Sequence, residues 1–537
     1  MRQLVRYPYG CLEQLTSRLV PFIALRELYG AFGVPYTGAA DDEEKQRAEP
    51  AIPDWLRGVD LAGVTDPDEI VRRTVRAIEQ LQTEGGGFRY WPEATCADPW
   101  ASAYALLALG RAAEVKYPVR EEVLDKAKRY LSGTVAAGKC SDCGFGCWPP
   151  DDATRIFALY ALARAGAAVP SYYGELFGRR AKLSLPAQAM LANAILNGGG
   201  DAKQGQQLLD EILSTAKQSA ADVHFEAVDV SPWEAVFSSH GRTTALVLET
   251  LVRREPSHPF VAKMAHYLGT VRRGDGTFRS TQEAAFALIA LTEVVRAKEK
   301  ETPDFVGKVL LGEQPLVSEP FKGRSLEVRR TLVPVDKLGA AGSKLPLVFS
   351  KEGQGVLYYG ALLRYAPAVL PTEPLDQGIA VQRWFEPLGG GGQADSFTAG
   401  ELVRVKLRVA TAIERNFVVV DVPLPAGLEV VDPTLASSAQ NNAEETSSGE
   451  GAGDEADDSP YRYAFYSPWS HVEQRDDRVL YFSDRLLPGI HEVSFVARAT
   501  TPGDFVLKPA QAEEMYAPEV FGRSHGGRFA VTVAEGK

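Results

Sequence analysis

Two stretches in the first half of the chain repeat the same order of features. GGFRYWPEATCADPWASAYALLALGRA and CGFGCWPPDDATRIFALYALARAG each contain a glycine–aromatic turn, a polar loop and a helical segment rich in alanine and leucine. Helices with small, apolar surfaces must bury those surfaces against similar neighbours. Because the turns fall at the same end of each unit, and no polar-faced capping repeat is visible, we expect a closed α/α toroid over residues 1–302. An open helical solenoid is the alternative.

Beyond the helical region, the apolar residues follow a period of two, which is typical of β-strands. KVLLGEQPLV and GVLYYGALLRYAP predict a small β unit over residues 303–375. LVRVKLRVAT, RVLYFSDRLLPG and HEVSFVARAT predict a β-sandwich over residues 376–537. Residues 434–460 are rich in acidic side chains and lack basic and aromatic ones, so we expect a disordered loop within the sandwich. The expected fold class is therefore multidomain α + β, with an α/α toroid followed by β-sandwich domains.

Length and charge narrow the classes of function. At 537 residues the chain is too long for a single core, and its net charge of −12 argues against nucleic acid as a partner. The sequence has no apolar run near the roughly 20 residues that a membrane span needs, and MRQLVRYPYG lacks the apolar region of a signal peptide. Either the protein is cytosolic or the sequence is a piece of a longer chain.

The five cysteines fall into two groups, because four of them cluster apart from Cys11. The four are Cys96, Cys140, Cys143 and Cys147. They can form two disulfides, which would indicate an oxidising compartment and favour the piece of a longer chain. A four-thiolate zinc site is the alternative, although a zinc ribbon would have two C-x-x-C motifs and the cluster has one.

The remaining cysteine lies in the segment YPYGCLEQ. Cys11 and Gln14 are three positions apart, so their side chains are neighbours if a helix begins here. A thiol that faces a carboxamide can expel ammonia and form an internal thioester, which is an activated acyl group. Water would destroy an exposed thioester, and Tyr7 and Tyr9 are expected to shield it. A structural cysteine at a helix start is the alternative.

The segment YPYGCLEQLTSR resembles the thioester segment of the bacterial alpha-2-macroglobulins. GGFRYWPEATCADPWASAYALLALGRAAEVKYPV is similar to the next helical block of that family's toroidal thioester domain. GQGVLYYGALLRY resembles the end of its CUB-like segment, and LPGIHEVSFVARATTPGDFVLKPAQAEEMYAPEVFGRS resembles its last macroglobulin domain. The resemblance thus covers nearly the whole chain in the family's order.

The resemblance implies a covalent protease inhibitor that works without a cofactor or a metal. Cys11 would be the thioester sulfur and Gln14 the acyl donor, and surface lysines of an attacking protease would be captured in a single turnover. The chain would be a C-terminal portion that acts together with upstream macroglobulin domains. The full-length protein would then be periplasmic, at the cell envelope or extracellular, and would contact a membrane only through an anchor that this chain does not contain.

Two details of the thioester are expectations. The first 223 residues contain no histidine, so we expect direct reaction with amines rather than transfer to hydroxyl groups. The later histidines of the helical region are expected to be structural: His224, His240, His258 and His266. Met515 and Tyr516 are expected to help shield the thioester, with packing inside the sandwich as the alternative.

Two other classes of protein remain open. One is an α/α-toroid enzyme, either a lyase or an enzyme that processes glycans or terpenoids. For it, Asp151 and Asp152 would be the acidic pair, although both are better explained as caps of the following helix. The other is a non-covalent adhesion module with a structural cysteine.

Overall fold

The computed structural model describes residues 4, 10–32, 66–139, 149–227, 232–273, 277–298, 302–324, 329–338, 344–363, 372–431 and 468–533. The chain divides into two compact units, Met1–Arg364 and Tyr365–Lys537. The expected acidic loop at 434–460 lies outside the described residues.

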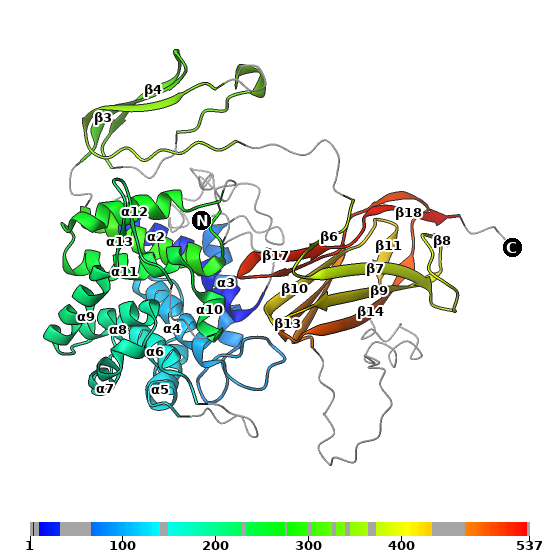
Figure 1. Ribbon diagram of the computed structural model, residues 1–537, viewed down its shortest axis with the longest axis horizontal. Coiled ribbons are helices and arrows are strands. Elements are labelled where there is room, and N and C mark those ends of the chain that lie inside the picture. Colours follow the sequence, from blue (N-terminus) through cyan, green and yellow to red (C-terminus); the bar gives the residue numbers. More distant parts are fainter. Residues whose placement is uncertain are drawn as a thin grey trace, which may run out of the picture. The chain divides into compact units, whose positions relative to one another are not determined.

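The first unit contains a ring of six inner helices. They are α2 (Leu12–Phe32), α4 (Pro99–Glu114), α6 (Asp152–Arg164), α8 (Leu185–Asn197), α11 (His240–Arg254) and α13 (Thr281–Lys298). Each packs against the next in this order, and α13 packs against α2, so the ring is closed (Figure 1). The expected α/α toroid is confirmed, and the open solenoid is excluded.

Outer helices cover the ring. They are α3 (Pro67–Gln80), α5 (Glu121–Tyr130), α7 (Tyr173–Gly178), α9 (Ala202–Ser214) and α12 (Pro259–Thr270). The inner helices are buried on nearly all sides, as shown by α4 and α6, whereas α5 buries one stripe of apolar residues. This difference follows from position, because an inner helix has neighbours all round and an outer helix has one covered face.

Local sequence sets the start of the inner helices. The Asp98 side chain accepts a hydrogen bond from the Ala101 amide at 2.6 Å, and Asp151 accepts from Thr154 at 2.8 Å. Ser239 caps α11 in the same way. A capping side chain satisfies amide groups that have no partner within the helix. The expectation that both aspartates cap this helix is confirmed for Asp151 and wrong for Asp152, which is the first residue of α6 and pairs with Arg155 at 3.1 Å.

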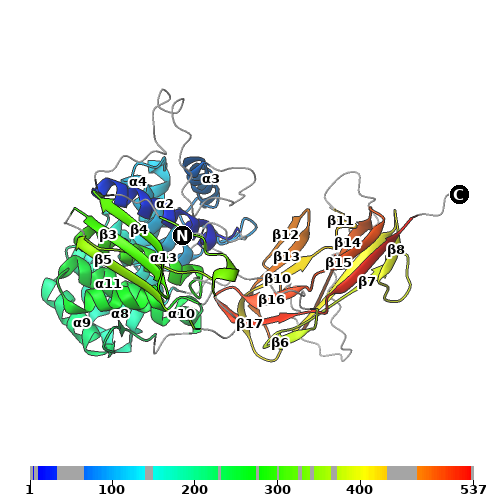
Figure 2. The ribbon, with the colours of Figure 1, turned by 90° about the horizontal axis from the view of Figure 1, so that it is seen from above.

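A short connection and a small sheet complete the first unit. The connection between α9 and α11 contains β1 (Lys217–Gln218), β2 (Val223–His224) and the short helix α10 (Pro232–Phe237). The sheet is antiparallel, in the order β4-β3-β5 (Figure 2), and consists of β3 (Asp304–Leu311), β4 (Gln314–Lys322) and β5 (Leu347–Gln354). Gly312 has φ +59° in the tight turn between β3 and β4, a conformation that favours glycine.

Three sheets form the second unit. The first has the order β12-β13-β10-β16-β17-β6, the second β11-β14-β9-β7 and the third β15-β18-β8. Their strands are β6 (Leu375–Gln377), β7 (Ala380–Pro387), β8 (Ser396–Thr398), β9 (Leu402–Thr411), β10 (Arg415–Pro423), β11 (Leu428–Val430), β12 (His471–Arg475), β13 (Arg478–Leu486), β14 (Gly489–Ala499), β15 (Gly503–Leu507), β16 (Gln511–Glu514), β17 (Ala517–Arg523) and β18 (Gly527–Thr532). Alternate residues of β9, such as Val403, Val405 and Leu407, enter one shared core, as the period of two predicted.

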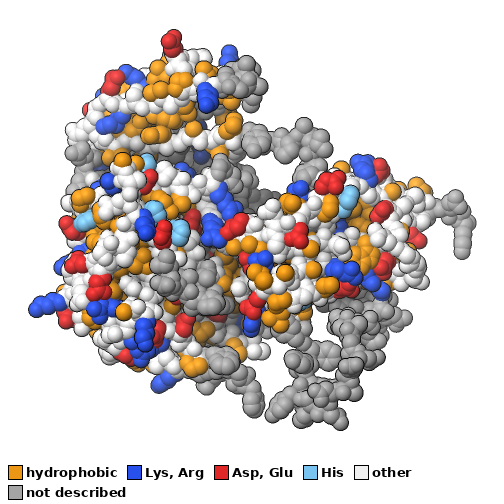
Figure 3. All heavy atoms as spheres, in the orientation of Figure 1, with side chains coloured by type: hydrophobic (Ala, Val, Ile, Leu, Met, Phe, Trp, Pro, Cys, Tyr) orange, Lys and Arg blue, Asp and Glu red, His pale blue; other side chains and the backbone are white. Residues whose placement is uncertain are grey.

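The surface of the described residues is mixed in character. Figure 3 shows acidic and basic side chains interspersed over one face, with hydrophobic side chains gathered over the sheet of β3, β4 and β5. Tyr358 and Tyr359, which follow β5, are 65% and 67% exposed. None of the described helices has the length and apolar character that crossing a bilayer requires.

The expected domain boundaries at 302/303 and 375/376 stay a prediction. The division into two compact units falls at 364/365.

Candidate functional site

Cys11 lies at the start of the first inner helix. It directly precedes α2, and its carbonyl accepts the first intrahelical hydrogen bond from Leu15 at 3.0 Å, so it occupies the N-cap position. The Leu12 amide is bound by the carbonyl of Tyr90 at 3.0 Å. Tyr90 belongs to the glycine–aromatic turn GGFRYW, so the repeated turn that precedes α4 also holds the start of α2.

The helix start explains how Cys11 and Gln14 can meet. With Cys11 at N-cap, Gln14 occupies N3. In a capping box, the side chain at each of these two positions bonds the backbone amide of the other, so both side chains lie on the same side of the first turn. Cys11 carries a thiol and is fully buried, and Gln14 is 1% exposed. The residues have the helical separation that the thioester hypothesis requires, in a place that excludes water. The thioester bond itself stays a prediction.

Glu13, between the two reacting residues, is a buried carboxylate with a full set of donors. The Ser17 hydroxyl donates to it at 2.7 Å, and the Thr281 hydroxyl lies 2.9 and 3.0 Å from its two oxygens. The Gln282 carboxamide donates at 2.6 Å. Glu13 itself is 0% exposed. A carboxyl group can be buried at tolerable cost when its oxygens are hydrogen-bonded in this way.

The first turn of α13 contacts both neighbours in the ring. Thr281 and Gln282 bind Glu13 of α2, while the Ser239 hydroxyl, which caps α11, donates to Glu283. Ser280 caps α13 by accepting from the Glu283 amide at 3.1 Å. The segment STQE therefore starts a helix and also joins the last inner helix to the first.

Buried groups around Glu13 have altered ionisation. Burial, followed by the nearby charge of Glu13, raises the pKa of the Tyr104 hydroxyl well above its usual range. That hydroxyl lies 2.9 Å from Ser17 Oγ, so Tyr104 belongs to the same network. Burial lowers the pKa of Arg242 to about 10, although Glu234 and other groups oppose this change. The Arg242 guanidinium lies over the Phe286 ring at 4.6 Å.

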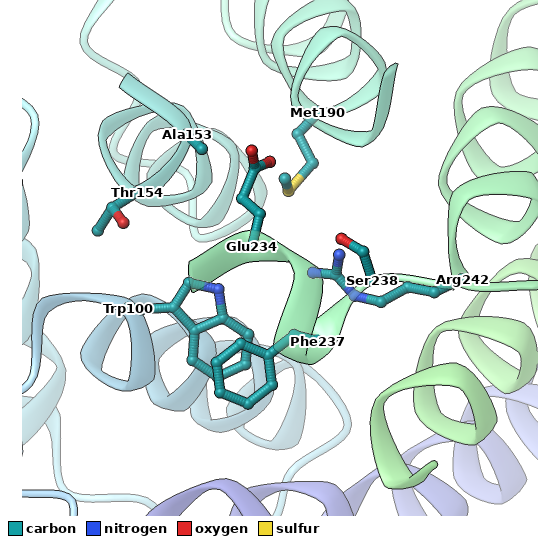
Figure 4. A pocket seen from close by; sticks show the side chains of 8 residues that line it. All are labelled: Trp100, Ala153, Thr154, Met190, Glu234, Phe237, Ser238 and Arg242. Carbon is teal, nitrogen blue, oxygen red and sulfur yellow. The ribbon is translucent and has the colours of Figure 1, made fainter. Parts of the chain in front are cut away.

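A small pocket opens at the N-terminal end of several inner helices. Trp100 of α4, Thr154 of α6 and Arg242 of α11 line it, together with Glu234 and Phe237 of α10 (Figure 4). The Trp100 and Phe237 rings are stacked, with centroids 3.9 Å apart. The Glu234 carboxylate accepts from the Ser184 hydroxyl at 2.6 Å.

The C-terminal end of the ring holds a charged network instead. Arg111 of α4 forms a two-pronged ion pair with Glu27 of α2, with a shortest distance of 2.7 Å. Burial opposes ionisation of Glu293, but Arg253 and Arg164 outweigh it and lower the pKa of that carboxyl. This end therefore joins helices through charge pairs, whereas Cys11 and Gln14 lie at the other end.

The expected shielding residues fall in different places. Tyr7 and Tyr9 lie outside the described residues. Met515 and Tyr516 are buried at the connection between β16 and β17 of the second unit. The Met515 amide donates to the Phe417 carbonyl at 2.9 Å, and the Tyr516 ring meets the Phe417 ring edge to face at 5.4 Å. These contacts agree with packing inside the sandwich, and the shielding role stays a prediction.

One member of the cysteine cluster is described. Cys96 is disulfide-bonded, and Cys140, Cys143 and Cys147 lie outside the described residues. Within the described ranges, no group of three or more histidine, cysteine, aspartate or glutamate side chains is arranged to hold a metal ion.

The histidines of the toroid have structural surroundings. His240 Nδ1 accepts from the Ala227 amide at 3.0 Å, and His258 Nδ1 accepts from the Phe260 amide at 3.1 Å. His266 Nδ1 lies 2.6 Å from Asp222, and His224 is stacked on Tyr267 with ring centroids 4.7 Å apart. These contacts fit the expectation that the four histidines serve the fold.

Three residues that could suggest an enzyme, Asp151, Asp152 and Ser524, form hydrogen bonds or ion pairs within the fold. Asp151 caps α6, and Asp152 pairs with Arg155 at 3.1 Å and with Arg179 at 3.2 Å. The sequence GRSHG at 522–526 has the spacing of a hydrolase nucleophile, yet it connects two strands of different sheets, β17 and β18, rather than a strand and a helix. Its Ser524 is buried and accepts from the Ala510 amide at 2.9 Å.

Sequence reasoning found Cys11 and Gln14 but missed their neighbours. Ser17 and Tyr104 carry no motif, and Thr281 and Gln282 lie 268 and 269 residues from Glu13. One signal was present, because STQE at 280–283 has the S-x-x-E spacing of a capping box and precedes the apolar helical segment AAFALIALTEVV.

Comparisons with known proteins agree with this architecture. Residues 378–519 match the family model of the bacterial alpha-2-macroglobulin MG10 domain. An alpha-2-macroglobulin homolog of Nostoc sp. is 25% identical over 465 residues, which cover 84% of this chain and 23% of the relative. The alpha-2-macroglobulin of Escherichia coli is 25% identical over 547 residues, covering 97% of this chain and 28% of the relative.

A solved structure extends the match in three dimensions. It is that of Salmonella alpha-2-macroglobulin reacted with methylamine, which is 25% identical and covers 99% of this chain and 30% of that one, with a TM-score of 0.65. The closed helical toroid and the β-sheet domains that follow it thus lie in a chain that matches a solved alpha-2-macroglobulin structure over 99% of its residues. The family model, the curated relatives and the solved structure all indicate the C-terminal portion of a bacterial alpha-2-macroglobulin, which this chain resembles over nearly its whole length. It spans about a quarter of the length of the two relatives just described.

Proposed function

We propose that this chain carries the reactive thioester of a broad-spectrum, covalent protease-trapping inhibitor. The observation that carries the proposal is the buried first turn of α2, where Cys11 and Gln14 occupy the N-cap and N3 positions in a chain that resembles the alpha-2-macroglobulins. That a Salmonella relative has been described as reacted with methylamine supports an amine-reactive group in the family.

The proposed bond forms by exchange at one carbonyl. The Cys11 sulfur attacks the side-chain carbonyl carbon of Gln14, a C–S bond forms, and the C–N bond breaks. Ammonia leaves with the proton of the thiol. The product is an acyl group attached to a good leaving group.

Capture reverses the exchange with a new amine. A lysine side chain of the protease attacks the same carbonyl carbon, a C–N bond forms and the C–S bond breaks. The proton lost by the amine passes to sulfur, so that Cys11 is released as a thiol. Each molecule reacts once, because no step regenerates the thioester, and the protein is therefore an inhibitor rather than an enzyme.

Burial sets when this reaction happens. Cys11 is fully buried and Gln14 is 1% exposed, so neither water nor a protease lysine can approach until the site opens. In the proposal, the upstream macroglobulin domains of the full-length protein respond to protease cleavage and open the site. The disulfide at Cys96 supports a periplasmic, cell-envelope or extracellular location, since disulfides persist in oxidising compartments.

Intact-mass measurement tests the proposal. Wild-type protein with the thioester is lighter than its sequence by one ammonia, and methylamine treatment should replace that ammonia and expose one thiol. Cys11→Ser is the control and should have the sequence mass before and after treatment. A wild-type mass equal to the sequence mass, unchanged by methylamine, would contradict the proposal and leave a structural cysteine in an adhesion module or another toroid protein.

A further inference from the structure

We propose that Glu13 is a positioning residue for the thioester: its buried carboxylate ties the first turn of α2 to the first turn of α13 and so holds Cys11 and Gln14 in reacting geometry. The inference rests on the proposed function and adds to it. It gives a role to Glu13, which lies between the two reacting residues but takes no part in the acyl exchange itself.

The contacts of Glu13 come from two helices. Ser17, one turn further along α2, donates at 2.7 Å, while Thr281 and Gln282 of α13 donate at 2.9 and 2.6 Å. The two contacts from α13 cross the junction between the last and the first inner helix of the ring. The position of the CLEQ turn is therefore fixed by ring closure and not by α2 alone.

The donor set favours a carboxylate over its amide. Every described side chain that bonds Glu13 points a hydroxyl or an N–H group at it. A glutamine at this position would direct its own NH₂ group at donors, which would leave a buried donor unsatisfied or force Gln282 to turn. The negative charge also lies in the first turn of α2, where the helix dipole favours an anion.

The geometry links this anchor to the reaction. Glu13 lies at N2, between the N-cap sulfur and the N3 carboxamide, so a shift of its backbone moves both reacting groups. Misplacement by about 1 Å can slow a positioned reaction by about a hundredfold. Without the anchor, the thiol should sample many orientations that do not reach the Gln14 carbonyl carbon, and C–S bond formation with loss of ammonia should slow.

Matched variants of two buried glutamates test the inference. Glu13→Gln removes the carboxylate beside the thioester. Glu283→Gln changes a carboxylate in the first turn of α13 that is 3% exposed and binds Ser239 of α11 rather than the CLEQ turn. Both proteins are made from the full chain and compared by circular dichroism and thermal unfolding. This comparison separates loss of the fold from loss of positioning.

The expected result differs between the two variants. Glu13→Gln should form thioester at least about tenfold more slowly than wild type, measured as loss of ammonia by mass spectrometry over time. Glu283→Gln should stay within about twofold of wild type. The double variant Glu13→Gln with Gln282→Glu restores a carboxylate–carboxamide pair across the junction and should recover part of the lost rate, which a merely destabilising effect would not do.

A second readout does not depend on the thioester. Hydrogen exchange of the Leu12–Gln14 amides, and alkylation of the Cys11 thiol, should both be faster in Glu13→Gln than in Glu283→Gln at equal global stability. Equal rates in the two variants would overturn the positioning role even if wild type forms a thioester. If the wild type forms no thioester but Glu13→Gln still exchanges faster than Glu283→Gln, the anchoring role of Glu13 is supported and the proposed function is rejected.

Discussion

At the scale of single residues, the site depends on what surrounds a common pair of side chains. A cysteine and a glutamine three positions apart occur in many helices, and the pair is inert if water reaches it. Here the cysteine is an N-cap, the glutamine is at N3, and both are buried. The proposed chemistry therefore depends on the helix position and the burial of the two side chains rather than on residue type alone.

The choice of nucleophile is a prediction at this scale. We expect methylamine to react with the thioester much faster than glycerol does, because the described histidines His224, His240, His258 and His266 are engaged in structural contacts. None of them is thereby set up to form an acyl intermediate that transfers to hydroxyl groups. The measurement is uptake of radiolabelled methylamine and glycerol at equal concentration. Efficient uptake of glycerol would contradict the expectation.

Alkaline pH should weaken the toroid through its buried phenols. The pKa of Tyr160 is raised well above 10 by burial and then by Glu249, to which its hydroxyl donates at 2.6 Å. Because the folded pKa exceeds the unfolded one, stability is fully present below pH 10 and declines as pH rises above 10, by about 1.4 kcal/mol per pH unit for one such group.

Tyr160→Phe should therefore flatten the loss of stability above pH 10, as followed by urea unfolding at several pH values. Tyr359→Phe is the matched control, because Tyr359 is 67% exposed. The lowered pKa of Arg242 acts in the opposite direction above about pH 10, since the folded state releases the Arg242 proton before the unfolded state does. Identical pH profiles for wild type and Tyr160→Phe would reject this assignment.

At the scale of elements, the sequence predicts what is local and misses what is not. The inner helices follow from apolar periodicity and from caps such as Asp98 and Asp151, and the strands of the sandwich follow from alternation. Ring closure was inferred from the pattern of turns. The contact of Glu13 with Thr281 had no such signal, because residues 268 positions apart meet only after six inner helices have packed.

The caps give a prediction for one element. Asp98→Ala removes the acceptor for the Ala101 amide at the start of α4 and should lower the free energy of unfolding by about 1 kcal/mol. Asp98→Asn is the matched control and should cost less, because asparagine caps nearly as well. Thermal unfolding monitored by circular dichroism measures both, and an Asp98→Ala protein as stable as wild type would show that the cap contributes nothing.

At the scale of the whole toroid, the two ends of the ring perform different tasks. The N-terminal end holds the proposed thioester turn, with contacts that α2 shares with α13. The C-terminal end is joined by buried charge pairs such as Arg111 with Glu27, whose side chains are 3% and 8% exposed. If the proposed thioester is present, these charge pairs would hold the inner helices together at the far end while the turn at Cys11 and Gln14 opens.

That division of tasks can be tested with the Arg111–Glu27 pair. Glu27→Gln removes the ion-pair partner of buried Arg111 but leaves the charges of Glu249 and Glu293 nearby, and it should cost at most about 3–5 kcal/mol of stability. The double variant Glu27→Leu with Arg111→Met replaces both charges by apolar groups and should recover most of the loss, since the desolvation cost disappears together with the attraction. Urea unfolding measures the stability of each protein, and mass spectrometry measures its thioester. If the C-terminal end only supports the fold, the double variant should form thioester at the wild-type rate. A slow rate in a stable double variant would show that the charge pairs also position the reactive turn across the length of α2.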